Sequence, residues 1–287
     1  MFRTLLFFLS LLALTGGAAE PALRDRANAL FAGQKWAEAQ GMLEKSIATE
    51  PQNAEAFYLL GRALLNQDKQ EAAVSALEKA TTLEPSNSEY FNRLGDAYGL
   101  TAQKAGLLSK MKWAGKCSAA YEKAIELDPK NIAARFSVLE YARQAPALVG
   151  GGMDKAYAQA AEIRKLDPAL GRRAYATLYA TDKKYDLAFA EYEEVLKAIP
   201  NDYGALFQTG RLAAISGARL ERGVETLKQC LSVTPPNGQP GHDAVNWRLG
   251  MIFEKQGDKA AARALYETAL KINPKFRQAL ESLKKLN

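Results

Sequence analysis

The residues that most often carry acid–base, nucleophilic or metal chemistry are few in this sequence and stand far apart. His242 is the only histidine, and the only cysteines are Cys117 and Cys230. A zinc site needs several histidine or cysteine ligands at short spacing, which this set lacks, and a single imidazole leaves at most one general base of that type. We therefore predict no catalytic residue, no metal site and no cofactor, and we expect that the protein is not an enzyme.

Phosphate-binding motifs are also missing from the sequence. The chain has neither the G-x-x-x-x-G-K-[ST] pattern nor a G-x-G-x-x-G turn between a strand and a helix. Gly150-Gly151-Gly152, just before an expected helix start at Met153, is a candidate anion site. It has no serine or threonine donors and no preceding strand, so we interpret it as a loop.

The elements that must position any functional residue are helices that recur along the chain. Similar helical runs end at a proline seven times, at Pro51, Pro85, Pro129, Pro168, Pro200, Pro235 and Pro274. The intervals scatter around a unit of about 34 residues, and self-similarity at such a period is typical of solenoid proteins.

The stretch from Ala54 to Asn87 shows the repeated unit most clearly. Its first half spaces apolar residues and a glycine at i, i+3, i+4 and i+7, which is one stripe of an amphipathic helix, and a second stripe follows a polar turn. The first stripe is Phe57, Leu60, Gly61 and Leu64, and the second is Ala73, Leu77 and Ala80. Pro85 ends the second helix because its ring interrupts the backbone hydrogen bonding.

A glycine recurs at one register of the first helix in four units, as Gly61, Gly95, Gly210 and Gly250. A glycine inside a helix costs up to about 1 kcal/mol relative to alanine, so four at one register indicate a close approach of two helices. We expect a larger side chain at Gly61 to destabilise the fold by overpacking.

These units resemble the tetratricopeptide repeat (TPR). Three sets of residues carry the match: Phe57, Leu60-Gly61, Ala73, Leu77, Ala80 and Pro85; Phe91, Leu94-Gly95, Tyr98, Tyr121, Ala124 and Pro129; and Leu249-Gly250, Phe253, Ala262, Tyr266, Ala269 and Pro274. The resemblance implies an all-α fold, a right-handed superhelical solenoid of antiparallel helix pairs with a C-terminal capping helix. We place the units at about 20–53, 54–87, 88–131, 132–170, 171–202, 203–237 and 243–276, and the cap at 276–287.

In TPR proteins generally, the first helix of each unit lines a concave groove that holds peptides. By that resemblance we expect groove residues in most units, and those that we single out for binding are Tyr58, Arg62, Asn92, Arg93, Phe136, Arg211 and Trp247, with Arg24, Asn28, Asp96 and Glu140 beside them. Some TPR proteins clamp a C-terminal carboxylate with basic residues and asparagines. Leu59 and Glu89 break two of the clamp positions, and Glu89 would repel a carboxylate, so we do not expect a clamp here.

Two insertions follow first helices and are therefore expected at the same edge of the solenoid. One spans residues 101–116 and the other residues 144–154. The first could contact a partner or an anionic membrane surface through a basic hairpin, with Lys104, Lys110, Lys112 and Trp113 as contact residues. The alternative is a longer helix pair whose apolar residues, Leu107, Leu108 and Met111, pack on neighbouring repeats. We favour packing, because apolar residues at helical spacing are usually part of the core.

The N-terminus predicts export. Residues 1–19 combine Arg3, the apolar run Leu5–Leu14 and small residues up to Ala19, which is typical of a cleavable signal peptide. The apolar run is shorter than the roughly 20 residues of a spanning helix. No cysteine lies near the cleavage site, so we expect a periplasmic or secreted protein that is not a lipoprotein. Its two cysteines would be buried separately, several repeats apart, rather than joined as a disulfide.

The functional prediction is a protein–protein interaction scaffold of the cell envelope that binds a partner segment in the concave groove. The partner's identity is open, and the protein would be a monomer or weak oligomer. The net charge of +6 is mildly basic and does not suggest a nucleic-acid partner. Two alternatives remain: a periplasmic small-molecule or saccharide binder, and a membrane-surface-associated assembly factor that uses the basic insertion.

Overall fold

The computed structural model describes residues 22–286. In that range the chain forms fifteen α-helices and one short 3-10 helix, and it contains no strand. The all-helical fold class is therefore confirmed. The predicted signal peptide, residues 1–19, lies outside the described residues. Among the described helices, none has the length and apolar character needed to cross a membrane.

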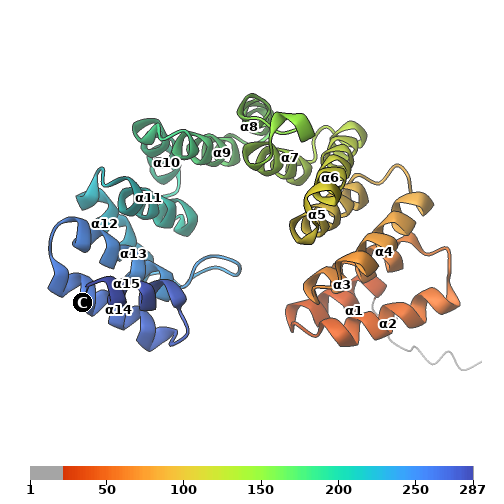
Figure 1. The fold of residues 1–287 in the computed structure, drawn as a ribbon, viewed down its shortest axis with the longest axis horizontal. Coiled ribbons are helices and arrows are strands. Elements are labelled where there is room, and N and C mark those ends of the chain that lie inside the picture. Colours follow the sequence, from red (N-terminus) through yellow and green to blue (C-terminus); the bar gives the residue numbers. More distant parts are fainter. Residues whose placement is uncertain (1–21, 287) are drawn as a thin grey trace, which may run out of the picture. The chain divides into compact units, whose positions relative to one another are not determined.

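The helices follow one another as hairpin pairs, with one helix left at the end (Figure 1). The pairs are α1 (Leu23–Ala32) with α2 (Trp36–Thr49), α3 (Ala54–Asn66) with α4 (Gln70–Leu83), α5 (Ser88–Lys104) with α6 (Leu107–Leu127), α7 (Ile132–Gln144) with α8 (Met153–Leu166), α9 (Pro168–Thr181) with α10 (Tyr185–Ala198), α11 (Tyr203–Ser216) with α12 (Leu220–Leu231), and α13 (His242–Lys255) with α14 (Lys259–Ile272). The short helix η1 (Ala147–Val149) lies between α7 and α8, and α15 (Arg277–Leu286) comes last.

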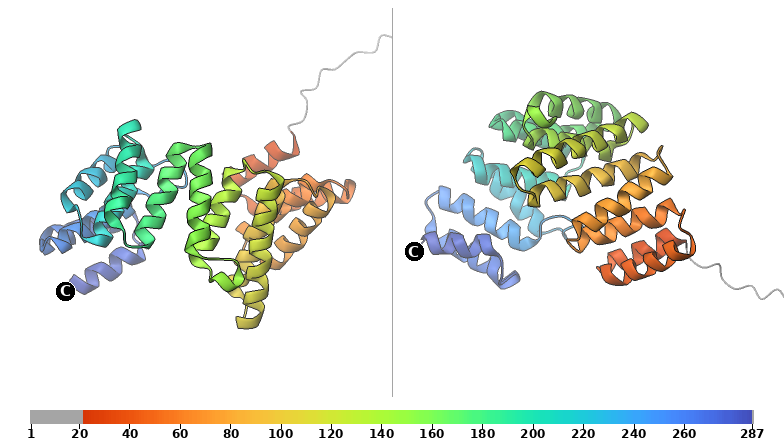
Figure 2. Two further views of the ribbon diagram at one scale, coloured as in Figure 1. Left: turned by 90° about the horizontal axis from the view of Figure 1, so that it is seen from above. Right: turned by 45° about the vertical axis from the view of Figure 1, so that its right-hand side comes forward.

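The helices group into two compact units, one ending at Glu84 and the other beginning at Pro85. The first unit holds α1 to α4 and the second holds α5 to α15. Within each unit the second helix of a pair contacts the first helix of the next pair, so the pairs stack in series (Figure 2). The last pair of the second unit is covered by α15, which packs on α14.

Several first helices begin at an asparagine or aspartate cap. The side chains of Asn53, Asn87, Asn131 and Asp202 each accept a hydrogen bond from the backbone N–H three residues later. Such caps satisfy one of the unpaired N–H groups of the first turn. Each cap stands two residues after the proline that follows the preceding helix, so proline and cap together separate one pair from the next.

The start of the fifth pair differs from the sequence-based boundary. Helix α9 begins at Pro168, and Asp167 caps it by accepting from the backbone N–H of Leu170. Residues 168–170, which we had assigned to the fourth unit, therefore form the first turn of the fifth pair. Proline is compatible with this position, because the N–H that it lacks would have no partner inside the helix.

The recurring glycines lie where the two helices of a pair approach most closely. A Cβ atom added at these positions would stand 2.4 Å from Leu77 at Gly61, 2.4 Å from Tyr121 at Gly95, 2.2 Å from Leu227 at Gly210 and 2.4 Å from Tyr266 at Gly250. Carbon atoms in contact normally stay about 3.5–4.0 Å apart, so no side chain fits there. The first helix thus leaves room for a large residue of the second, as the register predicted.

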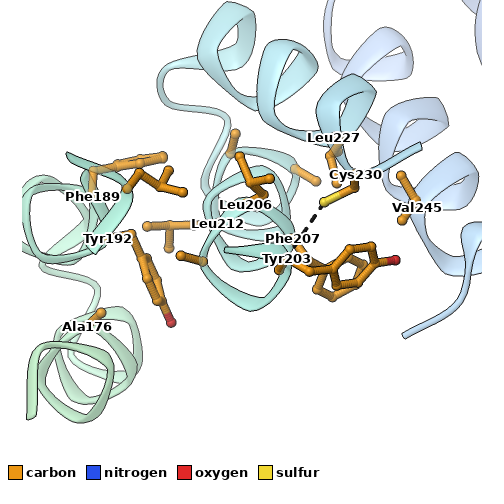
Figure 3. Close-up of a cluster of buried hydrophobic side chains, with 14 of the residues drawn as sticks. Ala176, Phe189, Tyr192, Tyr203, Leu206, Phe207, Leu212, Leu227, Cys230 and Val245 are labelled. Carbon is orange, nitrogen blue, oxygen red and sulfur yellow. Dashed lines mark hydrogen bonds between the residues drawn. The ribbon is translucent and has the colours of Figure 1, made fainter. Parts of the chain in front are cut away.

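One buried cluster of the second unit extends across three successive pairs, from α9 to α13. Phe189 and Tyr192 of α10, Leu206 of α11 and Leu227 of α12 belong to one cluster of buried side chains (Figure 3). Cys230 lies in the same cluster, and its thiol contacts the carbonyl oxygen of Tyr203. Cys117 and Cys230 are both buried free thiols, as predicted.

Candidate functional site

In the first unit, Tyr58 is buried beneath two arginines. Its side chain is 1% exposed, and the guanidinium carbons of Arg24 and Arg62 each lie 5.6 Å from its ring centroid. Arg62 also lies 4.9 Å from the ring of Phe31 and donates to Oδ1 of Asn28 at 3.4 Å. The first helices α1 and α3 therefore present stacked guanidinium groups, which the rings beneath them hold in place by cation–π attraction.

In the second unit, α5 carries a polar network around Asp96. Arg93 pairs with Asp96 at 2.7 Å, and the hydroxyl of Tyr121 donates to the same carboxylate at 2.8 Å. Burial raises the pKa of Asp96, and the positive charge of Arg93 opposes that shift. Oδ1 of Asn92 and Nε of Arg93 are buried without a hydrogen-bond partner. These two predicted residues thus keep unused polar atoms on α5.

Two of the predicted aromatic groove residues, Phe136 and Trp247, lie against other elements of the second unit. Phe136 is partly buried against the cluster formed by α7, α8 and α9. Trp247 packs edge-on against Phe276 with ring centroids 5.6 Å apart, and its Nε1 donates to Oγ of Ser282 at 3.1 Å. Trp247 therefore helps to hold the capping helix α15.

A pocket of about 220 Å³ opens among α7, α9, α10 and α11. Three of these elements are first helices, so the pocket lies on the surface where the resemblance places a groove. Each of the three first helices contributes polar side chains to the pocket, and α11 also contributes the apolar side chains of Leu212 and Ile215. The lining residues are Arg143, Thr177, Ala180, Thr181, Tyr185, Tyr192, Gln208, Arg211, Leu212 and Ile215.

The charge at this surface is positive. Arg143 pairs with Glu140 at 2.5 Å, whereas Arg211 is exposed and only donates to Gln208 at 3.2 Å. Arg248, on the next first helix α13, stacks on Trp247 at 4.0 Å. Burial lowers the pKa of Arg248 to about 10, and the positive charge of Arg211 adds to the shift. Within residues 22–286, neither Arg211 nor Arg248 has a carboxylate partner.

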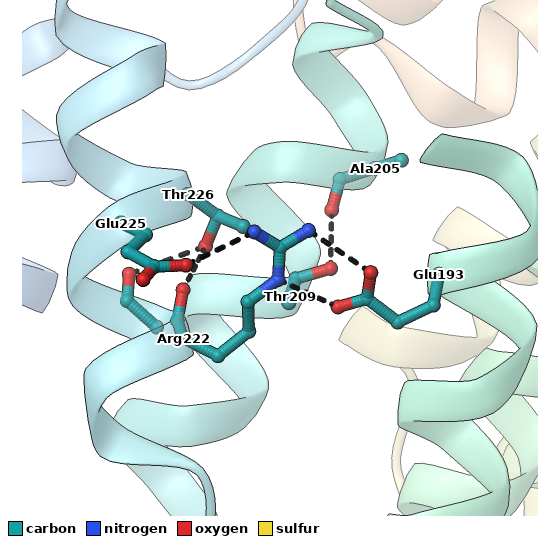
Figure 4. Close-up of polar contacts among 7 residues, drawn as sticks. Glu193, Ala205, Thr209, Arg222, Glu225 and Thr226 are labelled. Carbon is teal, nitrogen blue, oxygen red and sulfur yellow. Dashed lines mark hydrogen bonds and ion pairs between the residues drawn. The ribbon is translucent and has the colours of Figure 1, made fainter. Parts of the chain in front are cut away.

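Four half-buried arginines of this unit pair with carboxylates. Arg222 on α12 makes two hydrogen bonds to Glu193 on α10, at 2.8 and 2.9 Å, and a third to Glu225 (Figure 4). Arg164 and Arg172 share Glu191, while Arg173 pairs with Asp202. Unlike these four, Arg211 and Arg248 have no carboxylate partner among the described residues, which makes them candidate positions for a negatively charged ligand. The buried Arg135 also lacks a carboxylate, but its guanidinium donates to the carbonyl oxygen of Pro129 and to Oε1 of Gln159.

The first insertion is a helical extension rather than a loop. Helices α5 and α6 run through it and leave only Ala105 and Gly106 between them. Lys110 and Lys112 are exposed on α6, and Lys104 ends α5. Trp113 packs on Tyr98, with ring centroids 5.6 Å apart, and is only partly exposed.

The packing that we favoured for the apolar residues of this insertion is wrong. The pair is longer, as that interpretation required, but Leu107 and Leu108 are 79% and 86% exposed, and Met111 is also exposed. Helical spacing places these residues on one face, but among residues 22–286 no helix covers the end of the pair that extends beyond α7 and α8.

Most of the pocket was missed by sequence reasoning. Of its lining residues only Arg211 was singled out. Arg143 follows Phe136 and Glu140 at helical spacing, and Gln208 precedes Arg211 by three positions, so continuing each stripe along its helix would have found both. Thr177 and Tyr192 carried no such signal, because they come from a unit in which we had named no groove residue.

His242 has a structural contact. Its Nε2 lies 2.9 Å from the carbonyl oxygen of Val233, which ties the start of α13 to the preceding linker. In the part of the chain that the structure describes, no group of three or more histidine, cysteine or acidic side chains could hold a metal ion.

Comparison with known proteins agrees with the repeat. Three family models, each described as tetratricopeptide repeat, match residues 24–88 and 58–98, residues 99–131 and residues 244–276. No curated protein matches the sequence significantly.

Many solved structures share the fold. A tetratricopeptide repeat protein of Parabacteroides merdae aligns with a TM-score of 0.66 and 15% identity, over 92% of this chain and 97% of that one. Yeast Tom70 aligns with a TM-score of 0.62 and 14% identity, over 88% and 51%. A thermophilic TPR protein of Thermus thermophilus aligns with a TM-score of 0.55 and 21% identity, over 66% and 96%. The stacked helix pairs, the glycine register and these matches lead to one conclusion: the chain is a tetratricopeptide repeat protein.

Proposed function

We propose that this protein is an interaction scaffold of the cell envelope that holds a carboxylate-bearing segment of a partner protein. TPR repeats generally mediate protein–protein interaction, and the fold is typically a non-enzymatic scaffold. The single observation that supports an acidic partner is the pocket lined by Arg211, which has no carboxylate partner among the described residues. Arg248 of the next first helix does not line this pocket, but it lies near enough for the charge of Arg211 to lower its pKa. The signal-like residues 1–19 support a location outside the cytoplasm.

The pocket offers two kinds of contact to such a segment. Arg211 and the side-chain amide of Gln208 are hydrogen-bond donors for a carboxylate, and a bond to a charged group is stronger than one between neutral groups. Leu212 and Ile215 offer an apolar surface to a neighbouring side chain of the same segment. The positive charge would also speed the encounter with an acidic partner.

A peptide selection tests the proposal. Random peptides displayed against the chain from Glu20 onward should be enriched in aspartate and glutamate, and Arg211→Glu should weaken the selected peptides about tenfold or more, measured by fluorescence anisotropy. Lys79→Glu is the matched control, since it makes the same charge change on the exposed side of a second helix, α4. Selected peptides without acidic residues, or equal affinity for both variants, would contradict the assignment.

A further inference from the structure

The end of the α5–α6 pair projects beyond the neighbouring pair. Helix α6 has 21 residues and α5 has 17, whereas α7 and α8 have 13 and 14. Seven additional residues add roughly 10 Å at 1.5 Å per residue. In Figure 2 the yellow end of this hairpin extends past the helices that follow it, and the connection from α7 to α8 lies at the same end.

This end gathers the most exposed large hydrophobic side chains of the described chain. Leu107, Leu108 and Leu148 are 79%, 86% and 83% exposed, whereas the next most exposed such residue, Ile272, is 52% exposed. Leu148 lies on η1, which packs on α6, and Tyr141 ties the two together by contacting the carbonyl oxygens of Ala114 and Val149. Single exposed leucines are ordinary. Leu107 and Leu108 stand side by side at the projecting end, and Leu148 lies beside α6 about two turns further along, near Ala114, so the three together indicate a contact surface.

Lysines flank the apolar residues on both sides. At 100° per residue, Leu107, Met111 and Leu108 fall within an arc of about 100° on α6, with Lys110 on one side and Lys112 on the other. Residues 101–116 contain no aspartate or glutamate.

Acidic residues of the adjoining elements do not cancel this charge. Asp96 pairs with Arg93, Glu122 with Lys155, Glu126 with Lys123, Glu140 with Arg143 and Glu162 with Lys165, whereas Asp154 stands at the start of α8. Lys116 stacks on the rings of Tyr98 and Trp113, at 4.9 and 5.0 Å, and thereby stiffens the base of the projecting end.

We propose that this projecting end, residues 105–112 with Leu148, docks the protein on an anionic lipid surface. Leucines that enter the boundary between headgroups and acyl chains, beside lysines that meet lipid phosphates, form the pattern of an interfacial anchor. A convex tip suits a fluid surface that can close around it, whereas a protein partner would need a preformed matching pocket. This inference does not depend on the peptide-binding role of the pocket, which involves α7 to α11.

Vesicle sedimentation tests the inference with the chain from Glu20 onward, which keeps every described helix and removes the apolar run Leu5–Leu14. Phosphatidylcholine vesicles containing phosphatidylglycerol should bind about tenfold more protein than phosphatidylcholine alone, and the binding should weaken as salt screens the lysines. Leu107→Ser with Leu108→Ser should reduce binding about tenfold, as should Lys110→Glu with Lys112→Glu.

Two matched controls carry equivalent changes elsewhere. Leu187→Ser alters a leucine of α10 that is 49% exposed, and Lys79→Glu alters an exposed lysine of α4. Both should bind vesicles like the parent chain, and circular dichroism should show the same helix content in all variants. Failure of the parent chain to bind anionic vesicles, or equal binding by the leucine variant, would overturn the inference. Loss of a dimer in the leucine variant, without vesicle binding by the parent, would instead identify the tip as a surface between two copies.

Discussion

The two thiols show how burial controls reactivity at the scale of one residue. Burial raises the pKa of Cys117 and of Cys230 to about 12, whereas an ordinary thiol ionises near 8.5. The raised pKa keeps both groups protonated at pH 8, and only the thiolate reacts. Iodoacetamide at pH 8 should therefore leave the folded protein unmodified and label both cysteines in urea, as mass spectrometry would show. Rapid labelling of either cysteine in the folded chain would contradict the described burial.

At the residue scale, the register of one helix was enough to single out Arg211, which lines the pocket. Contacts with a second element could not be predicted in this way. Trp247 was singled out as a groove residue, and the sequence did not indicate that its ring packs on Phe276 and donates to Ser282. Leu107 and Leu108 have core-like spacing, but spacing alone does not tell whether another helix covers a face.

The contact between helices of a pair makes a prediction at the scale of the element. An alanine Cβ at Gly61 would stand 2.4 Å from Cγ of the buried Leu77, so Gly61→Ala should destabilise the protein by about 1–3 kcal/mol through overpacking. Gly41, inside α2, has no atom within 4 Å of such a Cβ. Gly41→Ala should instead stabilise by about 0.5–1 kcal/mol, because alanine is the better helix former.

Urea unfolding followed by circular dichroism measures both changes. The two substitutions are chemically identical and lie in the same unit, so their opposite signs would isolate the effect of the helix contact. A midpoint that moves in the same direction for both variants would mean that α3 and α4 do not approach each other at Gly61.

At this scale the sequence predicted the helix pairs well. The glycine, the apolar stripe and the terminal proline can each be recognised within a single repeat, without knowing the rest of the fold. The boundary at Pro168 was harder, since proline can follow a helix or open one. The asparagine and aspartate caps two residues after the prolines are a further local signal, and they would have improved the boundaries of several first helices.

The whole molecule consists of two units of unequal size, which leads to a prediction about folding. A solenoid needs about three repeats to bury enough surface, because each repeat rests only on its neighbours. The unit that begins at Pro85 holds five helix pairs and α15, whereas the described part of the other holds two pairs. A fragment spanning residues 85–287 should keep its helix content and unfold cooperatively, and a fragment of residues 20–84 should be largely unfolded at room temperature.

Circular dichroism and calorimetry of both fragments check this expectation. Cooperative unfolding of the short fragment would show that two pairs suffice in this protein. A long fragment without helix content would show that the pairs after Pro85 depend on those before it. The division itself was not foreseen from sequence, because the repeat pattern runs through Pro85 without a change in composition or a linker.

Each of the four recurring glycines and the large residue packed against it belong to the same helix pair. A duplication that copies the chain from one proline to the next therefore copies both the glycine and the large residue packed against it. The two helices of the new pair can then pack together without further substitutions. Lineages can lengthen or shorten such a chain by whole hairpins at little cost to folding, provided that the terminal cap is kept. The hairpin ends lie outside this contact and can change in length without disturbing it, as the 17 and 21 residues of α5 and α6 illustrate.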